Sequence, residues 1–337
     1  MVNRIDVAKL AGVSPTTVSR VLNENGYVSE EVRSKVKKAI EELEYVPNRM
    51  GRNLRMQKSG QIACITNGLS NPFYSEIVLG IEEIALANDY TFSIYSSDLD
   101  KQQYNQLIMG GFYDGVIVLT PLTFLESIDP QKVREVVPIS ILWDQAGKTD
   151  IPNVRINLKQ AMVKIMNHLL DNGHSEIVYL GEAEYGVEIT QSERFNGYLE
   201  TLKNRNISLS EEYLLDVPSW ENDLIFACAK VKELLNKQVP FTAIAAFNDS
   251  MALGAMRALA ESGLSVPGDI SITGFDDIEI SSMITPSLTT ATLPKKAIGQ
   301  SLMNILLRQI RGEQIDGTVV EYTADLVNRE SVKNINQ

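Results

Sequence analysis

The stretch that decides the fold is residues 6–23, which reads DVAKLAGVSPTTVSRVLN. Gly12 stands where a first short helix ends, because glycine adopts the left-handed backbone conformation at little steric cost. Ser14 is a suitable N-cap for a second helix, and Pro15 suits its first position, where a missing N–H matters least. A third helix is expected after Ser29, which we predict to be its cap. The predicted helices cover residues 5–11, 15–23 and 29–44.

Two short helices joined by a glycine-containing turn are typical of helix-turn-helix DNA-binding units, whose second helix enters the major groove. On that helix, Arg20 suits a guanine edge and Thr16 suits a base edge or a thymine methyl group. Thr17 and Ser19 suit phosphates. A generic three-helix subdomain is the alternative, but the small residue Ala8, the turn and the capped helix together favour DNA. The predicted contacts are Ser14, Pro15, Thr16, Thr17, Ser19, Arg20 and Asn23.

The charge distribution separates a basic head from an acidic body. The chain has 337 residues and a net charge of −12. Residues 1–58 hold 11 Lys and Arg against 7 Asp and Glu, a balance of +4, and the remainder holds 20 against 36, a balance of −16. Since attraction to phosphate depends on the local field within about one Debye length of ~8 Å, the head can bind DNA despite the overall sign.

Several classes of protein fit the composition poorly. The chain is long enough for two or three domains, and 44% of its residues are hydrophobic, which argues against disorder. It shows no membrane-length apolar run and no secretory signal pattern at its start, so we expect a cytoplasmic location. Two cysteines, two histidines and no catalytic motif argue against an enzyme, and we expect no cofactor and no metal site.

Residues 6–23, together with the segment YVPN at 45–48 and Arg49, Arg52 and Leu54, resemble the head and hinge of the lactose-repressor (LacI/GalR) family of bacterial transcription regulators. The resemblance continues through nearly the whole chain. It implies a DNA-binding repressor with a hinge helix, a two-lobed body of the periplasmic-binding-protein fold, and a small effector bound between the lobes.

The hinge is expected over residues 48–55, within a head of residues 1–58. Arginines recur there at every third position, but a helix this short is marginal alone in water, and Gly51 costs it about 1 kcal/mol against alanine. We therefore predict that it orders only on DNA. By resemblance, paired hinges enter the minor groove and Leu54 opens a central base step. A plain charged linker is the alternative. The predicted contacts are Asn48, Arg49, Arg52, Leu54 and Arg55.

From residue 61 onward, buried-strand runs alternate with helical segments through two cycles. Such alternation predicts an α/β body of doubly wound parallel sheets, and two cycles indicate two similar lobes. The family resemblance implies that the chain crosses between the lobes three times, near 157, 288–290 and 322–325. The expected N-lobe is 59–156 plus 290–321, and the expected C-lobe is 157–289 plus 322–337.

Polar and aromatic residues that follow the strands are the candidate effector contacts, because open parallel sheets bind ligands beyond the carboxyl ends of their strands. Arg194 opens a run similar to the family's Arg-x-x-Gly-aromatic motif. Some candidates have a purely structural alternative: Asn248 and Asp276 as helix caps, Phe73 as a core residue. No pocket contact is assigned to Leu293 or Lys295. The candidates are Asn71, Phe73, Tyr74, Asp144, Arg194, Trp220, Asn248 and Asp276.

The sequence thus predicts a dimeric, nucleoid-associated transcriptional repressor that binds a pseudo-palindromic operator, since one recognition helix reads too few bases. An arginine, carboxylates and a tryptophan favour a sugar or sugar phosphate as the effector. A purine or nucleoside and a phosphorylated partner protein are alternatives. A solute-binding protein is the competitor from another class, and the basic head argues against it.

Overall fold

A computed structural model describes residues 2–22, 25–46, 58–66, 71–96, 108–119, 130–142, 150–181, 192–217 and 222–336. The chain divides into two compact units, Met1–Ser59 and Gly60–Gln337, which are described separately below as the head and the body. The predicted hinge, residues 48–55, lies outside the described residues.

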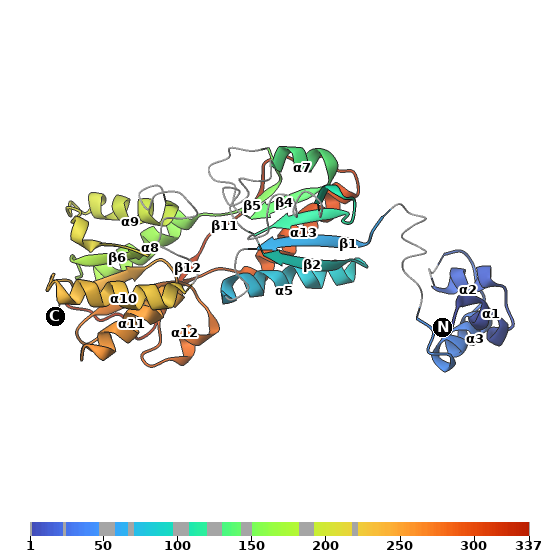
Figure 1. The fold of residues 1–337 in the computed structure, drawn as a ribbon, viewed down its shortest axis with the longest axis horizontal. Helices are drawn as coiled ribbons and strands as arrows, with labels where there is room; N and C mark the ends of the chain where they lie inside the picture. Colours follow the sequence, from blue (N-terminus) through green and yellow to red (C-terminus); the bar gives the residue numbers. More distant parts are fainter. Residues whose placement is uncertain are drawn as a thin grey trace. The chain divides into compact units, whose positions relative to one another are not determined.

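The head contains the three predicted helices, α1 (Arg4–Ala11), α2 (Pro15–Leu22) and α3 (Glu30–Glu42) (Figure 1). Gly12 ends α1 with φ 65°, and its N–H donates to the carbonyls of the last turn. Asn3 and Asp6 form a capping box at the start of α1, which sequence inspection missed. Ser29 occupies the N-cap position of α3 as predicted, but its side chain makes no hydrogen bond to the helix.

Small and β-branched side chains form the core of the head. Val7, Val18 and Val36 are fully buried, one from each helix, so the three helices share a single apolar cluster. Ala8 and Ala39 are also buried in it, and their small side chains allow α1 and α3 to pack closely. The core therefore fixes the orientation of α2, whose remaining face is available for contacts.

The first lobe of the body is built on a parallel six-stranded sheet with the order β11-β5-β4-β3-β1-β2. Alternate residues of β1 point to opposite faces: Ile62 and Cys64 pack with α5 and α13, whereas Ala63 and Ile65 pack on the side of α7. Helices thus cover both faces, as predicted. The elements are β1 (Gln61–Thr66), α5 (Pro72–Ala87), β2 (Thr91–Ser96), β3 (Gly115–Val118), α7 (Pro130–Val136), β4 (Ile139–Leu142), β5 (Asn153–Ile156), α13 (Lys295–Ile310) and β11 (Thr318–Tyr322).

The second lobe repeats the plan with the order β12-β10-β9-β8-β6-β7, in which only the β10–β12 pair is antiparallel. Helices α8 and α9 cover one face, and α10 and α11 cover the other (Figure 1). The elements are α8 (Leu158–Asp171), β6 (Ile177–Gly181), α9 (Glu193–Asn204), the short 3-10 helix Glu211–Tyr213, β7 (Leu214–Asp216), α10 (Asp223–Asn236), β8 (Ala243–Ala246), α11 (Asp249–Glu261), β9 (Ser271–Asp276), α12 (Glu279–Met283), β10 (Thr289–Thr292) and β12 (Asp325–Val327).

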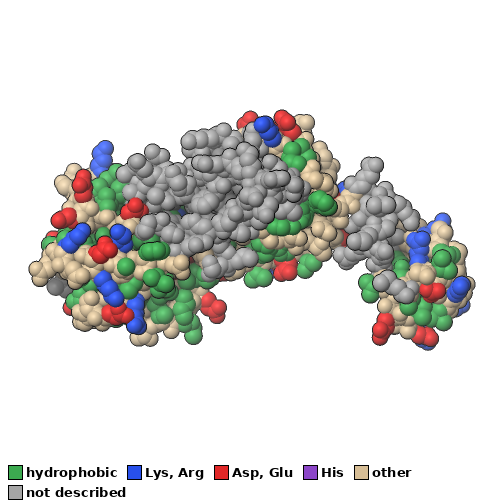
Figure 2. Space-filling view, in the orientation of Figure 1, with side chains coloured by type: hydrophobic (Ala, Val, Ile, Leu, Met, Phe, Trp, Pro, Cys, Tyr) green, Lys and Arg blue, Asp and Glu red, His purple; other side chains and the backbone are tan. Residues whose placement is uncertain are grey.

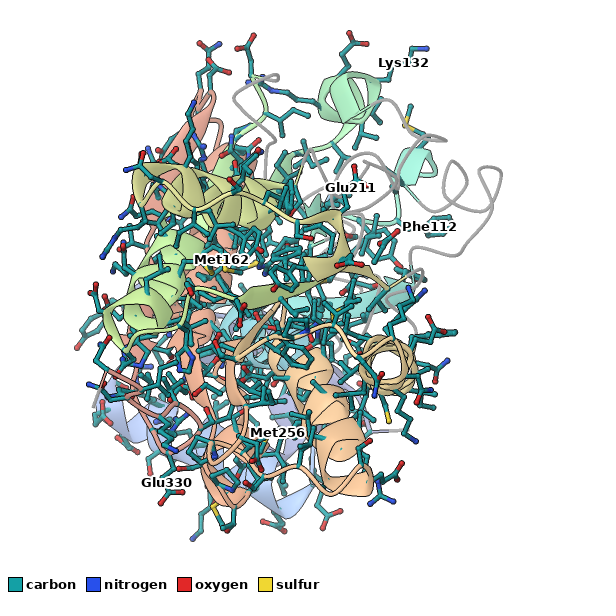
Figure 3. The ribbon with its side chains drawn as sticks, turned by 90° about the vertical axis from the view of Figure 1, so that its left-hand side faces the viewer. Phe112, Lys132, Met162, Glu211, Met256 and Glu330 are labelled. Carbon is teal, nitrogen blue, oxygen red and sulfur yellow. The ribbon has the colours of Figure 1, made fainter. Side chains whose placement is uncertain are left out.

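The chain passes between the lobes after β5, after β10 and between β11 and β12. The second passage lies later than the expected 288–290, because β10 pairs with β9 as far as Thr292. One hydrophobic cluster includes residues of both lobes, such as Ile62 and Ile177. In Figure 3, the side chain of Met162 lies inside the body, where it is fully buried, whereas Phe112 and Lys132 lie at its edge.

No helix among those described combines the length and the apolar character of a membrane span.

Candidate DNA-binding helix and buried polar site

The exposed face of α2 carries the residues predicted to contact DNA. Ser14 caps the helix: the Thr17 N–H donates to its Oγ at 3.1 Å, and the two hydroxyl oxygens lie 2.9 Å apart. Val18 and Val21 are buried against the other helices, whereas Thr16 and Arg20 are exposed. The same eight-residue helix therefore has an anchoring face and a free face, the arrangement that a recognition helix requires.

The surface of the head carries charges of both signs in the view of Figure 2. Some cations are paired within the head, such as Lys35, which lies 2.8 Å from Glu31 on α3. Arg20 is exposed in the last turn of α2. Six of the predicted DNA contacts lie outside the described residues: Asn23, Asn48, Arg49, Arg52, Leu54 and Arg55.

Arg194 lies in the first turn of α9, where Ser192 caps the helix by accepting from the Phe195 N–H. The Arg194 side chain is buried, with its guanidinium carbon 4.1 Å from the ring centre of Phe247 and 4.4 Å from that of Phe275. Both distances are typical of cation–π contacts, which stabilise a desolvated cation. The guanidinium thus contacts two aromatic rings at the carboxyl ends of β8 and β9.

Asp276, the last residue of β9, faces this guanidinium, and its Oδ1 lies 4.0 Å from an Arg194 nitrogen. Burial raises the pKa of Asp276 to about 8, although the Arg194 guanidinium acts in the opposite direction. The backbone is unusual here, with φ 106° at Asp276 and 52° at Asp277. Non-glycine residues keep such conformations only where their surroundings hold them, and these positions cluster at functional sites.

A buried carboxylate that is not among the eight predicted effector contacts supports the loop after β9. Asp249 accepts hydrogen bonds from the Ile278 N–H at 2.9 Å, the Ser281 hydroxyl at 2.7 Å and the Thr290 hydroxyl at 2.6 Å. Burial raises the pKa of Asp249 to about 6, although these bonds oppose the change. Asp249 therefore connects the start of α11 to α12 and β10. This role could not be predicted from the residue type, because the partners are distant in the sequence.

The two candidate asparagines are helix caps. Asn71 accepts from the Phe73 N–H at 2.9 Å at the start of α5, and Asn248 accepts from the Met251 N–H at 2.7 Å at the start of α11. The amide nitrogen of Asn248 donates to Asp223, and burial raises the pKa of that carboxyl. Their capping roles account for both side-chain oxygens.

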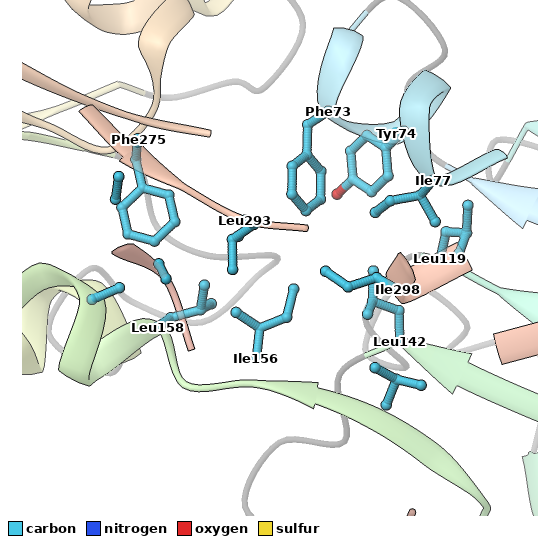
Figure 4. Packing of buried hydrophobic residues seen from close by; sticks show 14 of the residues in the cluster. Phe73, Tyr74, Ile77, Leu119, Leu142, Ile156, Leu158, Phe275, Leu293 and Ile298 are labelled. Carbon is cyan, nitrogen blue, oxygen red and sulfur yellow. The ribbon is translucent and has the colours of Figure 1, made fainter. Parts of the chain in front are cut away.

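The aromatic candidates Phe73 and Tyr74 lie in the first turn of α5 and are 3% and 5% exposed. Their rings meet edge to face with centres 5.2 Å apart. In the cluster of Figure 4, Leu293 lies between these rings and Phe275 of the second lobe. Buried hydrophobic residues thus form a continuous cluster from Phe275, beside Arg194, to α5 of the first lobe.

Two of the eight predicted effector contacts, Asp144 and Trp220, lie outside the described residues. Of the other six, the structure brings Arg194 and Asp276 into contact, with Asn248 close by through Asp223. Lys295, to which the sequence assigned no role, is buried beside them and donates to the Asp276 carbonyl. Within the described ranges, no group of three or more His, Cys, Asp and Glu residues is placed to hold a metal ion.

A helix-turn-helix head and a two-lobed body with a buried polar site define a DNA-binding regulator of the ligand-sensing type. Residues 5–48 match the model of the bacterial regulatory proteins of the lacI family, and residues 166–332 match that of the periplasmic binding protein-like domain. Two repressors named PurR are similar to this chain over 98% of both lengths, at 34% identity in Vibrio vulnificus (strain CMCP6) and 33% in Aliivibrio fischeri (strain MJ11).

Solved structures give the same result. The lac repressor dimer bound to operator and the anti-inducer ONPF is 29% identical with a TM-score of 0.81, and the match covers 98% of this chain and 99% of that one. A CelR–cellobiose complex is 26% identical with a TM-score of 0.71, covering 98% and 100%. The chain belongs to the LacI family of transcriptional repressors, as the sequence resemblance implied.

Membership settles the general function. LacI-family repressors bind operator DNA, dimerise and bind small effectors. The expectation that the chain is not an enzyme is confirmed by its relatives, which are regulators without catalytic activity. A solute-binding protein is thereby excluded, because the head that such a protein lacks is present and matches the family.

Proposed function

We propose that a neutral, hydrogen-bonding effector occupies the site around Arg194 and Asp276 and thereby controls operator affinity. The observation that carries this proposal is the buried pair itself, in which a guanidinium offers donors beside a carboxyl group whose backbone is strained. A guanidinium donates at several fixed positions, and a carboxyl group with a pKa near 8 can accept or donate near neutral pH. The pair suits a ligand with neighbouring donor and acceptor atoms.

The charge balance argues against a sugar phosphate, which was part of the first expectation. Each cation of the described site already lies beside a carboxyl group: Arg194 faces Asp276, and Lys295 lies 3.0 Å from Glu76. A phosphate bound here would need a cation that is not committed elsewhere, because a buried anion without a partner is costly. A neutral ring compound avoids this cost.

A purine base or nucleoside is our first choice of effector, because two similar repressors are named PurR and because aromatic residues border the site. Phe73, Tyr74, Asn71, Asn248, Asp144 and Trp220 remain proposed contacts. A neutral sugar is the second candidate, favoured by the likeness to a regulator solved with cellobiose. A phosphorylated partner protein is a third, which would follow if no small molecule bound.

The experiment is calorimetric titration of the full-length protein with hypoxanthine, guanine, guanosine, D-ribose, cellobiose and glucose 6-phosphate. The proposal expects binding of a purine compound and no binding of glucose 6-phosphate. It also expects that Asp276→Ala weakens binding of the same compound. Binding of the sugar phosphate alone, or unchanged affinity in the variant, would contradict the assignment.

For DNA, we propose that α2 reads the major groove through Thr16 and Arg20, with Ser14, Pro15, Thr17, Ser19 and Asn23 near the backbone. A dimer would place two such helices on the half-sites of a pseudo-palindrome. The proposed hinge contacts are Asn48, Arg49, Arg52, Leu54 and Arg55. Leu54→Ala should weaken operator binding and leave effector binding intact, and unchanged operator affinity would refute the wedge. DNA binding also supports the cytoplasmic, nucleoid-associated location expected from the sequence.

A further inference from the structure

Lys295 is the first residue of α13 and is 4% exposed. Its ammonium nitrogen donates to the Asp276 carbonyl at 2.7 Å and to the Asp277 carbonyl at 2.8 Å, and it lies 3.0 Å from Glu76 Oε1. A lysine ammonium group has three N–H donors, and three acceptors surround this one. A buried cation with every donor satisfied is a fixed part of the structure.

The three acceptors belong to different lobes. Asp276 ends β9 in the second lobe and Asp277 follows it, whereas Glu76 lies on α5 in the first lobe, where α13 also packs. Lys295 is therefore anchored in the first lobe and bonded to the backbone of the second. The two carbonyls that accept these bonds belong to Asp276 and Asp277, which both have positive φ, so the bonds help to keep the backbone in that conformation.

We propose that Lys295 is a positioning residue that fixes Asp276 in the effector site and connects this site to α5 of the first lobe through Glu76. The inference rests on the proposed effector site. An effector that contacts Asp276 changes the position of the residue 276–277 backbone, and the ammonium group passes that change to α5. A connection of this kind is needed if occupancy of the site is to alter the first lobe.

The chain offers a matched control one residue further on. Lys296 also starts α13 and lies 2.8 Å from a glutamate of α5, Glu83, but these side chains are 63% and 50% exposed. This pair joins the same two helices within one lobe and does not reach the effector site. Exposed pairs contribute little, so its loss tests whether any lysine at the start of α13 has the proposed effect.

The test is amide hydrogen exchange of the full-length protein without ligand, followed by exchange with hypoxanthine as the probe. Lys295→Met should speed exchange of residues 276–281 by about tenfold or more, because local opening becomes easier. Glu76→Ala should speed the same segment by a smaller factor of about three, although it lies in the other lobe. Lys296→Met and Glu83→Ala should leave it unchanged.

In the wild type, hypoxanthine should slow exchange in both residues 276–281 and residues 72–76. In Lys295→Met, any remaining protection should be confined to the first segment. Unchanged exchange of 276–281 in Lys295→Met and Glu76→Ala, or an equal increase in Lys296→Met, would overturn the proposal. If none of hypoxanthine, guanine and guanosine binds the wild type, the proposed effector class fails, and the ligand-free exchange still decides the role of Lys295. Should Lys295→Met not fold, Glu76→Ala carries the test alone.

Discussion

Helix α2 of the head and the Arg194 site of the body differ in where their functional residues lie: on the surface in α2 and in the interior at the Arg194 site. In α2, Thr16 and Arg20, which are proposed to read bases, are exposed on one helix and are supported by the Ser14 cap and a core of nearby residues. At the Arg194 site, the polar residues are buried and come from α9, β9, α11 and α13. In the head, the residues proposed to bind DNA lie on the surface, whereas in the body the residues proposed to bind the effector are also part of the packed core.

This difference determines what a substitution does. A change on the exposed face of α2 should alter binding and leave folding unchanged, because no buried group loses its partner. A change at the Arg194 site should alter both, because each buried polar group depends on the others. The following four predictions test this contrast.

The largest effect is expected for Arg194→Ala. The change removes the cation between Phe247 and Phe275 and leaves Asp276 buried without it. We expect a loss of about 3 kcal/mol in the free energy of unfolding, measured by urea denaturation. Arg205→Ala is the control, because it breaks an exposed pair with Asp171 and should cost less than about 1 kcal/mol. Similar losses in the two variants would contradict the contrast.

Arg20→Ala should weaken binding to a duplex selected from a random pool by the wild type. A bidentate contact to guanine contributes about 1–3 kcal/mol of discrimination, so we expect a loss of this size in operator binding, measured by fluorescence anisotropy. Stability toward urea should not change. Lys38→Ala, an exposed residue of α3, should weaken binding less and without regard to sequence. A loss that is equal on operator and unrelated duplexes would argue against base reading by Arg20.

Asp276→Asn should change the pH dependence of stability. The pKa of Asp276 is raised in the folded state, so its stabilising contribution is complete below about pH 4 and is lost as the pH rises through about 8. The wild type should therefore lose stability relative to the variant over this range, by at most about 1.4 kcal/mol per pH unit. Urea denaturation from pH 5 to pH 8 measures the difference. Parallel curves for the two proteins would show that this carboxyl does not titrate there.

The smallest effect is expected for Asn3→Ala in the head. Asn3 accepts from the Ile5 N–H at 2.8 Å and from the Asp6 N–H at 3.3 Å, so its loss should destabilise α1 by about 1 kcal/mol. Hydrogen exchange of α1 in the full-length protein measures this. Lys37→Ala, which is exposed on α3, is the control. Exchange changes that extend into residues 271–283 would contradict the independence of the two regions.

The head could be predicted from the sequence because its determinants are local. Gly12, Ser14 and Pro15 mark the turn and the start of α2 within four residues, and the structure places them as expected. Ser29 lies at the predicted N-cap position of α3, but its residue type did not show that its hydroxyl would make no hydrogen bond to the helix. Local signals predict the position of an element better than its side-chain contacts.

The body could be predicted as an architecture but not as a site. Arg194 was predicted from its resemblance to a family motif, and Asp276 from its place at the end of a strand. The roles of Asp249 and Lys295 were not predicted, because these roles depend on burial among distant residues. Lys295 donates to the carbonyl of Asp276, 19 residues away in the chain and in the other lobe, and it lies 3.0 Å from Glu76 of α5. The second passage between the lobes was placed too early for a related reason, since only strand pairing shows that β10 extends to Thr292.

The central claim is that effector binding in the body changes the affinity of the head for operator DNA. One measurement tests this claim directly. Operator affinity of the full-length protein should be measured with and without the effector found by titration, and effector affinity with and without operator. The two ratios must agree, because linkage between two binding sites is reciprocal. We predict a ratio of about fivefold or more in both directions. Operator affinity that is the same at zero and saturating effector would contradict the account.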